Sequence, residues 1–132
     1  MKSSAKSNTV KRKTVASTAK VKGIVADGRI WIATSEGKLV GKGRIELMEK
    51  IKKLGSIRQA AADMQMSYRQ AWQLIDDVNT KAKTPLVISQ RGGAGGGKAV
   101  VTAEGEKVIA QFKVFNQRFQ KFLKEEAAKF KG

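Results

Sequence analysis

Two residue types, cysteine and histidine, are missing from the 132 residues of this chain, and their absence excludes several functions. Without cysteine there are no disulfides and no thiolate nucleophile, and without histidine there is no imidazole general base. A zinc site built from the two is excluded as well. The acidic pairs Asp76–Asp77 and Glu125–Glu126 are sequence neighbours, which on a helix diverge by about 100° and cannot share a substrate. The sequence therefore predicts a protein that is not an enzyme and uses no cofactor.

Long apolar runs are also missing, and this absence bears on where the protein acts. The longest apolar stretches are a few residues, far below the roughly 20 that a helix needs to span a bilayer. The N-terminus has no apolar segment of the kind that a secretory signal requires. We expect a cytoplasmic protein with no membrane partner.

Acidic residues are scarce: 11 Asp and Glu stand against 27 Lys and Arg, a formal net charge of +16. Residues 1–22 hold seven of the basic residues and no acidic one, which leaves 20 basic and 11 acidic residues, a net of +9, in 23–132. Such an excess favours a polyanionic partner, with nucleic acid ahead of an anionic membrane surface. Residues 1–22 are expected to form a disordered basic tail, which either solubilises the protein or adds phosphate contacts.

Residues 23–54 predict a hairpin followed by a helix. A β-branched and aromatic strand is followed by the turn 35–38, where Gly37 supplies the positive φ of a tight turn, and by a second strand. Residues 44–54 then form an amphipathic helix that Gly55 ends. Its predicted buried side chains are Ile45, Leu47, Met48, Ile51 and Leu54.

The stretch 55–83 predicts two short helices separated by a break at Met64–Met66. Ser56 and Ser67 can each cap a helix by accepting a hydrogen bond from a free backbone N–H group. Spacings of three and four place an apolar stripe on the second helix, residues 67–82, and polar side chains on its opposite face. The stripe is Tyr68, Ala71, Trp72, Ile75 and Val78, and the polar side chains are Arg69, Gln70 and Gln73. Two short helices joined by a tight turn form a helix-turn-helix.

The residues after this motif predict a wing. Pro85 closes the second helix, and residues 86–90 and 99–101 favour strands. The segment 91–98 between the strands forms a loop. Thr102 can then cap a last helix, whose first turn carries acidic residues. The predicted fold is mainly α with small β: a winged helix-turn-helix with an N-terminal β-hairpin and a long C-terminal dimerisation helix.

The glycine-rich loop 92–99 nearly matches the phosphate-cradling pattern G-x-x-x-x-G-K-[ST] of nucleotide-binding proteins. Ala99 stands where the hydroxyl that holds Mg²⁺ is required, and the residues after Lys98 favour a strand, whereas a cradle needs a helix N-terminus there. An NTPase is therefore a distant alternative. A glycine-rich wing tip can instead lie close to a sugar-phosphate strand while Arg91 and Lys98 pair with phosphates.

Large apolar side chains recur along the last helix at alternating steps of four and three residues. The series is Val108, Phe112, Phe115, Phe119 and Phe122. This spacing is typical of a coiled-coil seam, and a helix of this length is about 40 Å long. We expect it to join two copies of the chain. The predicted regions are a tail, 1–22, a winged helix-turn-helix DNA-binding domain, 23–102, and a dimerisation helix, 103–132.

Three segments in order carry a family resemblance: GSIRQAAADMQMSYRQAWQLIDDVN, then PLV, then RGGAGGGKAVVTAEGEKVI. With the preceding GRIELMEKIKKL they closely resemble the N-terminal DNA-binding domain of the molybdate-responsive ModE regulators. The resemblance covers roughly residues 25–125 and implies a prokaryotic, LysR-like winged-helix dimer joined by long helices. It departs at Gln65, where the family usually has glycine, so Gln65 is expected to be left-handed or to shift the turn. The family continues into molybdate-binding domains, and no molybdate site is evident in this chain.

The sequence thus predicts a sequence-specific transcriptional regulator that binds double-stranded DNA as a homodimer. The helix 67–82 would lie in the major groove and the wing 91–98 on the backbone. Arg69 is expected to pair with a guanine edge, and Gln70 and Gln73 with other base edges. Phosphate contacts are expected from Arg58, Ser67, Tyr68, Arg91 and Lys98. Two alternatives stay open: an architectural, sequence-tolerant DNA-binding protein, and an interaction module whose long helix binds another protein.

Overall fold

The computed structural model describes residues 23–90 and 97–130 and divides the chain into two units. The larger unit spans Arg29–Phe119, and the smaller combines the described residues before Arg29 with those from Gln120 onward. The strands and the first three helices belong to the larger unit, whereas the last helix begins in it and ends in the smaller one. Of the helices in the described ranges, none is long and apolar enough to cross a membrane.

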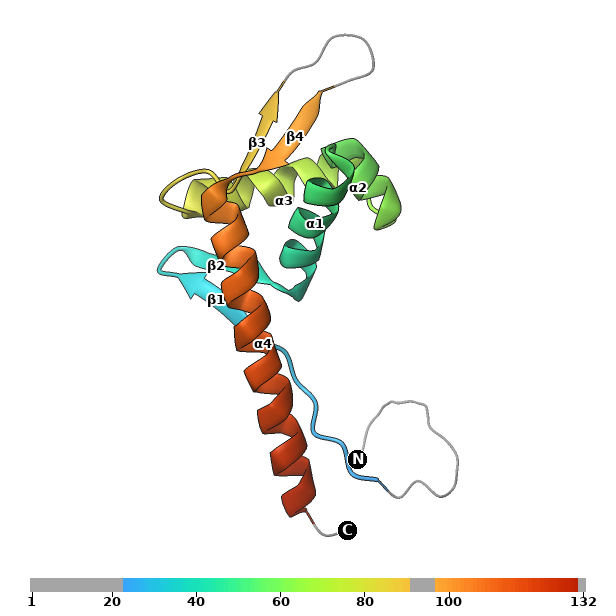
Figure 1. The fold of residues 1–132 in the computed structure, drawn as a ribbon, viewed down its shortest axis with the longest axis vertical. Helices are drawn as coiled ribbons and strands as arrows, with labels where there is room; N and C mark the ends of the chain where they lie inside the picture. The colour runs from blue at the N-terminus through green and yellow to red at the C-terminus, as the bar shows by residue number, and fades with distance from the viewer. Residues whose placement is uncertain (1–22, 91–96, 131–132) are drawn as a thin grey trace. The chain divides into compact units, whose positions relative to one another are not determined.

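Helices dominate the described secondary structure, and two antiparallel hairpins accompany them (Figure 1). In chain order the elements are β1 (Trp31–Thr34), β2 (Gly37–Gly41), α1 (Lys42–Leu54), α2 (Ile57–Asp63), α3 (Tyr68–Lys81), β3 (Val87–Gln90), β4 (Lys98–Val101) and α4 (Ala103–Lys129). The predictions of a mainly α fold, an N-terminal hairpin and a long last helix are confirmed.

The first hairpin pairs β1 with β2 in antiparallel register, Thr34 opposite Gly37. Gly37 has a φ of +122°, which glycine adopts without a steric penalty, so it has the role that the sequence predicts. The Lys38 ammonium lies 3.5 Å from the centroid of the Trp31 ring. The hairpin leads directly into α1, so its orientation is tied to the start of that helix.

Two serine caps set the starts of α2 and α3. Ser56 Oγ accepts a hydrogen bond from the Gln59 N–H at 3.1 Å, and Ser67 Oγ accepts one from the Gln70 N–H at 3.0 Å. Between the helices Gln65 has a φ of 58°, so the left-handed conformation expected at this non-glycine residue is confirmed. Both α2 and α3 contact α1. The three helices together form the predicted helix-turn-helix with its supporting helix.

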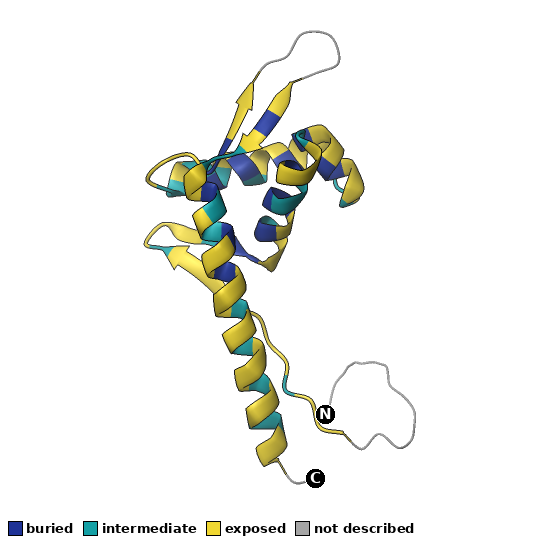
Figure 2. Cartoon of the chain, in the orientation of Figure 1, coloured by how far each residue is buried: buried dark blue, intermediate teal, exposed yellow. Residues whose placement is uncertain are grey.

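One apolar core joins these helices to both hairpins and to the start of α4 (Figure 2). Its buried side chains are Val40, Ile45, Leu47, Met48, Ile51, Ile57, Ala60, Ala61, Ala71, Ile75, Val78, Leu86, Val87, Ala99, Ile109 and Phe112. The predicted burial of Leu54 is wrong, since this side chain is exposed. Leu54 is the last residue of α1, and the covered part of that helix stops before it.

The second hairpin forms the wing. β3 pairs with β4 in antiparallel register, Gln90 opposite Lys98. Ala99 is buried in β4 and donates its N–H to the Gly55 carbonyl at 2.9 Å, which fastens the wing to the end of α1. The predicted winged helix-turn-helix is therefore confirmed. The predicted wing loop, which begins at Arg91, lies outside the described residues as far as residue 96.

The last helix, α4, begins at a threonine cap and runs for 27 residues. Thr102 Oγ1 accepts a hydrogen bond from the Gly105 N–H at 3.0 Å, as its predicted role requires. Gly105 is buried, and a Cβ at this position would lie 2.3 Å from the Leu86 carbonyl oxygen. Because the glycine has no Cβ, the first turn of α4 can pack directly on the chain that enters β3. Ile109 and Phe112 then bring the next turns onto the core.

The structure divides the predicted aromatic seam of α4 between two environments. Phe112 is 4% exposed and belongs to the core, and Val108 packs against that core. Phe115 and Phe122 are 37% and 53% exposed, and Phe119 lies between these extremes. The prediction of one stripe facing a second copy is therefore wrong for Val108 and Phe112. The chain's own core uses them, because α4 starts on that core and leaves it only after several turns.

Candidate nucleic-acid interface

The outer face of α3 carries polar side chains with hydrogen-bond donors. Its inner face is buried through alanine, isoleucine and valine, so the other side of the helix points to solvent. Arg69, Gln70 and Gln73 are exposed, as the helical spacing predicts. No described side chain forms an ion pair with Arg69. A guanidinium and two carboxamides on one exposed helix face form a surface that can donate to base edges.

A small hollow opens beside this face, where the starts of α2 and α3 meet the wing. It has a volume of about 100 Å³ and draws its lining from α2, α3, β3 and β4. The lining residues are Ser56, Ile57, Arg58, Gln59, Tyr68, Ser89, Gly97, Lys98 and Ala99. Three residues predicted separately from the sequence, Arg58, Tyr68 and Lys98, thus border one hollow. Two cations at one opening favour an anionic group there.

Arg58 and Tyr68 also contact each other. The Arg58 guanidinium carbon lies 4.2 Å from the centroid of the Tyr68 ring. Such cation–π stacking limits the positions that a flexible arginine samples. Ser67, the residue before Tyr68, uses its oxygen as the helix cap, so it keeps only its hydroxyl proton for a ligand. The start of α3 therefore combines a capped helix terminus with an arginine held over an aromatic ring.

The predicted apolar stripe of α3 is buried only in its middle. Tyr68 is 39% exposed and Trp72 is 41% exposed, so their predicted place in a buried stripe is wrong. Leu74, outside the predicted stripe, packs against the core instead. The buried arc of the helix is therefore rotated away from Tyr68 and Trp72. Sequence spacing alone does not fix this rotation, because it depends on where α1 and α2 lie.

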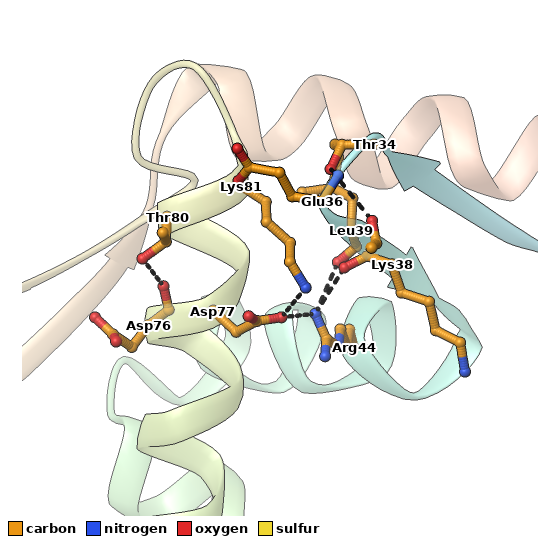
Figure 3. Close-up of polar contacts among 10 residues, drawn as sticks. Thr34, Glu36, Lys38, Leu39, Arg44, Asp76, Asp77, Thr80 and Lys81 are labelled. Atoms are coloured by element: carbon orange, nitrogen blue, oxygen red, sulfur yellow. Dashed lines mark hydrogen bonds and ion pairs between the residues drawn. The ribbon is translucent and has the colours of Figure 1, made fainter.

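Ion pairs hold the later turns of α3 against the first hairpin and α1 (Figure 3). Arg44 Nη1 donates to Asp77 Oδ2 at 2.6 Å and to the carbonyls of Lys38 and Leu39 at 3.2 and 3.3 Å. Lys81 Nζ donates to the same Asp77 oxygen at 2.9 Å. The bonds from Lys81 and Arg44 lower the pKa of the Asp77 carboxyl below its usual range. The carboxylate is therefore ionised near neutral pH, and two cations offset its charge.

A single asparagine ties α3 to the wing. Asn79 Nδ2 donates to the Val87 carbonyl at 2.8 Å, and Asn79 Oδ1 accepts from the Leu86 and Val87 N–H groups at 2.8 and 3.2 Å. The side chain therefore satisfies three backbone groups where the chain enters β3. Neither Asn79 nor the Arg44 pair was apparent from the sequence. Arg44 and Asp77 are 33 residues apart, and no periodicity in the sequence joins them.

Comparison with known proteins gives relatives of one kind, although no family model matches the sequence. Molybdenum transport protein ModE of Azotobacter vinelandii is 35% identical over 95 residues, which are 72% of this chain and 35% of that protein. DNA-binding transcriptional dual regulator ModE of Escherichia coli K12 is 40% identical over 78 residues, 59% of this chain and 30% of the relative. The chain is similar to the ModE proteins.

The similarity extends to a differently named relative and has a limited reach. Molybdenum-pterin-binding protein MopB of Rhodobacter capsulatus is 36% identical over 87 residues, 66% of this chain and 32% of its own length. The chain spans about a third of the length of each of these curated relatives. A relationship to ModE and its molybdenum-associated relatives therefore holds for the matched region, and the activities of the whole relatives do not follow from it.

Proposed function

We propose that this protein is a sequence-specific DNA-binding transcriptional regulator that acts as a homodimer. The observation that carries the proposal is the joint position of the polar face of α3 and the cationic hollow beside it. A major groove admits one α-helix, and the flanking phosphate backbone passes close to the ends of that helix. The similarity to a relative named a DNA-binding transcriptional dual regulator supports the same function.

The proposed base contacts come from α3. Arg69 donates two bonds to the O6 and N7 atoms of a guanine, and Gln70 and Gln73 bond to neighbouring base edges. Asp76, one turn beyond Arg69 and Trp72, is exposed and acidic, so close approach of phosphate at that point is unfavourable. The first half of α3 is therefore the part that enters the groove most deeply.

The proposed phosphate contacts surround the hollow. Arg58, stacked on the Tyr68 ring, and Lys98 at the start of β4 bind backbone oxygens of one strand. The Ser67 hydroxyl proton adds a further donor, and Arg91 remains a candidate on sequence grounds. These contacts fix the position of α3 on the duplex and carry no sequence information themselves.

The proposed dimer uses an apolar strip of α4, which replaces the aromatic seam predicted from sequence. Its first part is a shallow open groove lined by Ala110, Gln111, Val114, Phe115 and Arg118. Phe122 follows Phe115 by seven residues, which places both on the same side of the helix. Exposed aromatic and aliphatic side chains along one helix are removed from water when two such helices pair. The regions that we propose remain a tail, 1–22, a DNA-binding domain, 23–102, and a dimerisation helix, 103–132.

The decisive experiment compares specific and random duplexes. Sites are first selected from a random library with wild-type protein, and Kd is then measured on the selected site and on scrambled DNA. Arg69→Ala should weaken binding to the selected site by about 1–3 kcal/mol and leave scrambled DNA nearly unchanged. Lys98→Ala, the matched control, should weaken both alike, because it removes a phosphate contact.

The salt dependence tests the same proposal independently. If each protomer neutralises about four phosphates, log Kd should change with log salt with a slope of magnitude near 7 for the dimer. A slope near zero would exclude a DNA-binding function. Equal losses on both duplexes for Arg69→Ala would instead favour a sequence-tolerant architectural protein.

A molybdenum oxyanion is a second candidate ligand, because MopB is named for binding molybdenum-pterin. The hollow between Arg58 and Lys98 offers two cations to an oxyanion as readily as to a backbone phosphate. Calorimetry with molybdate, on wild type and on Lys98→Ala, separates the two. Tight stoichiometric molybdate binding that Lys98→Ala abolishes would favour this candidate, whereas heat changes seen only with duplex DNA would favour the regulator.

A further inference from the structure

Trp72 lies on the recognition helix in a position that core packing does not explain. The side chain is 41% exposed, and it is not among the partly buried side chains that pack against the core. An indole is one of the largest apolar groups that a protein can bury, so leaving it in water forgoes a considerable stabilisation. Its exposure on α3 therefore requires a separate explanation.

The position of Trp72 along α3 places it at one edge of the polar face. Residues three apart on a helix are neighbours, so Trp72 stands next to Arg69. Gln70 lies on the other side of Arg69, about 100° further around the helix. The exposed face thus has Arg69 near its middle, an apolar edge at Trp72 and a polar edge at Gln70.

Only one base presents an apolar group in the major groove. Thymine carries a C5-methyl there, whereas the other groove atoms of the four base pairs are hydrogen-bond donors and acceptors. The other exposed side chains of α3 from Arg69 to Thr80 are polar or charged, and they are Arg69, Gln70, Gln73, Asp76 and Thr80. An apolar contact to a methyl group is therefore available to α3 through Trp72.

We propose that Trp72 is a specificity-determining residue that contacts the C5-methyl groups of thymines next to the base pair read by Arg69. The inference rests on the proposed DNA-binding function and adds a chemical class of base to it. The indole loses water-exposed surface in the complex, and the methyl group supplies the apolar partner that no described residue provides.

Replacing thymine with deoxyuridine tests this directly, because it removes the methyl and leaves every hydrogen-bonding group in place. In a wild-type-selected site each thymine is replaced in turn, and Kd is measured for wild type, Trp72→Ala and Trp72→Phe. Burial of one methyl group corresponds to roughly a fourfold change in affinity. We expect wild type to lose about fourfold at one or two thymines, Trp72→Phe to retain most of that sensitivity, and Trp72→Ala to show none at those positions.

The outcomes separate this inference from the function on which it depends. A deoxyuridine penalty that persists unchanged in Trp72→Ala, or no penalty at any thymine in wild type, would overturn the role of Trp72 and leave the regulator intact. A library selection that yields no preferred site would overturn the proposed function itself. Should Trp72→Ala lose its helical circular dichroism, Trp72→Gln supplies the same test, since glutamine is a good helix former without an aromatic ring.

Discussion

The two helices α3 and α4 both begin at a hydroxyl cap and both place an apolar side on the same core, yet they expose opposite chemistry. α3 exposes a guanidinium and carboxamides beside a cationic hollow, with one tryptophan at the edge. α4 exposes valine and phenylalanine over the length that follows its contact with the core. A polar exposed face suits a ligand with many hydrogen-bonding groups, and an apolar one suits a second protein surface. Two amphipathic helices in one small chain therefore point to two different partners.

The largest expected effect tests the part of α4 that belongs to the core. Phe112→Ala should destabilise the folded chain by about 3–5 kcal/mol, because it leaves a cavity among well-packed side chains. The measurement is urea unfolding followed by circular dichroism. A loss below about 1 kcal/mol would contradict the assignment of Phe112 to the core.

The next effect tests the exposed part of the same helix. Phe115→Ala combined with Phe122→Ala should weaken dimerisation by about 100-fold or more, since each substitution is counted twice in a symmetric pair. Sedimentation over a concentration series measures this, with DNA titration alongside. Unlike Phe112→Ala, the double variant should leave the monomer's unfolding free energy nearly unchanged. A wild-type protein that stays monomeric at high micromolar concentration would exclude the α4 interface.

A smaller effect tests how α3 is attached to the wing. Asn79→Ala removes a side chain that serves three backbone groups and should destabilise the fold by about 1–3 kcal/mol. Thr80→Ala is the matched control, because Thr80 bonds only to the Asp76 carbonyl within its own helix and is exposed. Equal destabilisation by the two variants would show that the Asn79 bridge adds nothing.

The smallest effect concerns the ion pairs at the later turns of α3. Asp77→Asn should lower stability at neutral pH by about 1 kcal/mol or less, because the pairs are partly exposed. The folded carboxyl has a pKa below its ordinary value of about 3.9, so its contribution is present above that value. It is lost as the pH falls through the lower folded pKa. Unfolding midpoints for both proteins should therefore converge in acid, and a difference that is independent of pH would contradict the ionic explanation.

Local chemistry in the sequence was enough to predict most elements of the fold. Ser56, Ser67 and Thr102 cap the helices that they were expected to cap, and Gly37 has the expected positive φ. Gln65 adopts the left-handed conformation that was one of two predicted outcomes. These features depend on hydrogen bonds and dihedral angles within a few residues, and so they are visible in the order of residues.

The sequence by itself determined the helices, the hairpins, the excess of positive charge and the list of candidate phosphate ligands. The tertiary structure decided which side of each helix is covered: it exposed Trp72, buried Phe112, and brought Arg58 and Lys98 to one hollow. It also joined Arg44 to Asp77 across 33 residues. Periodicity gives the angular spacing of side chains around a helix but not its rotation against its neighbours. That rotation is set by how the whole core packs, and it separates a side chain that stabilises the fold from one that is left to meet a partner.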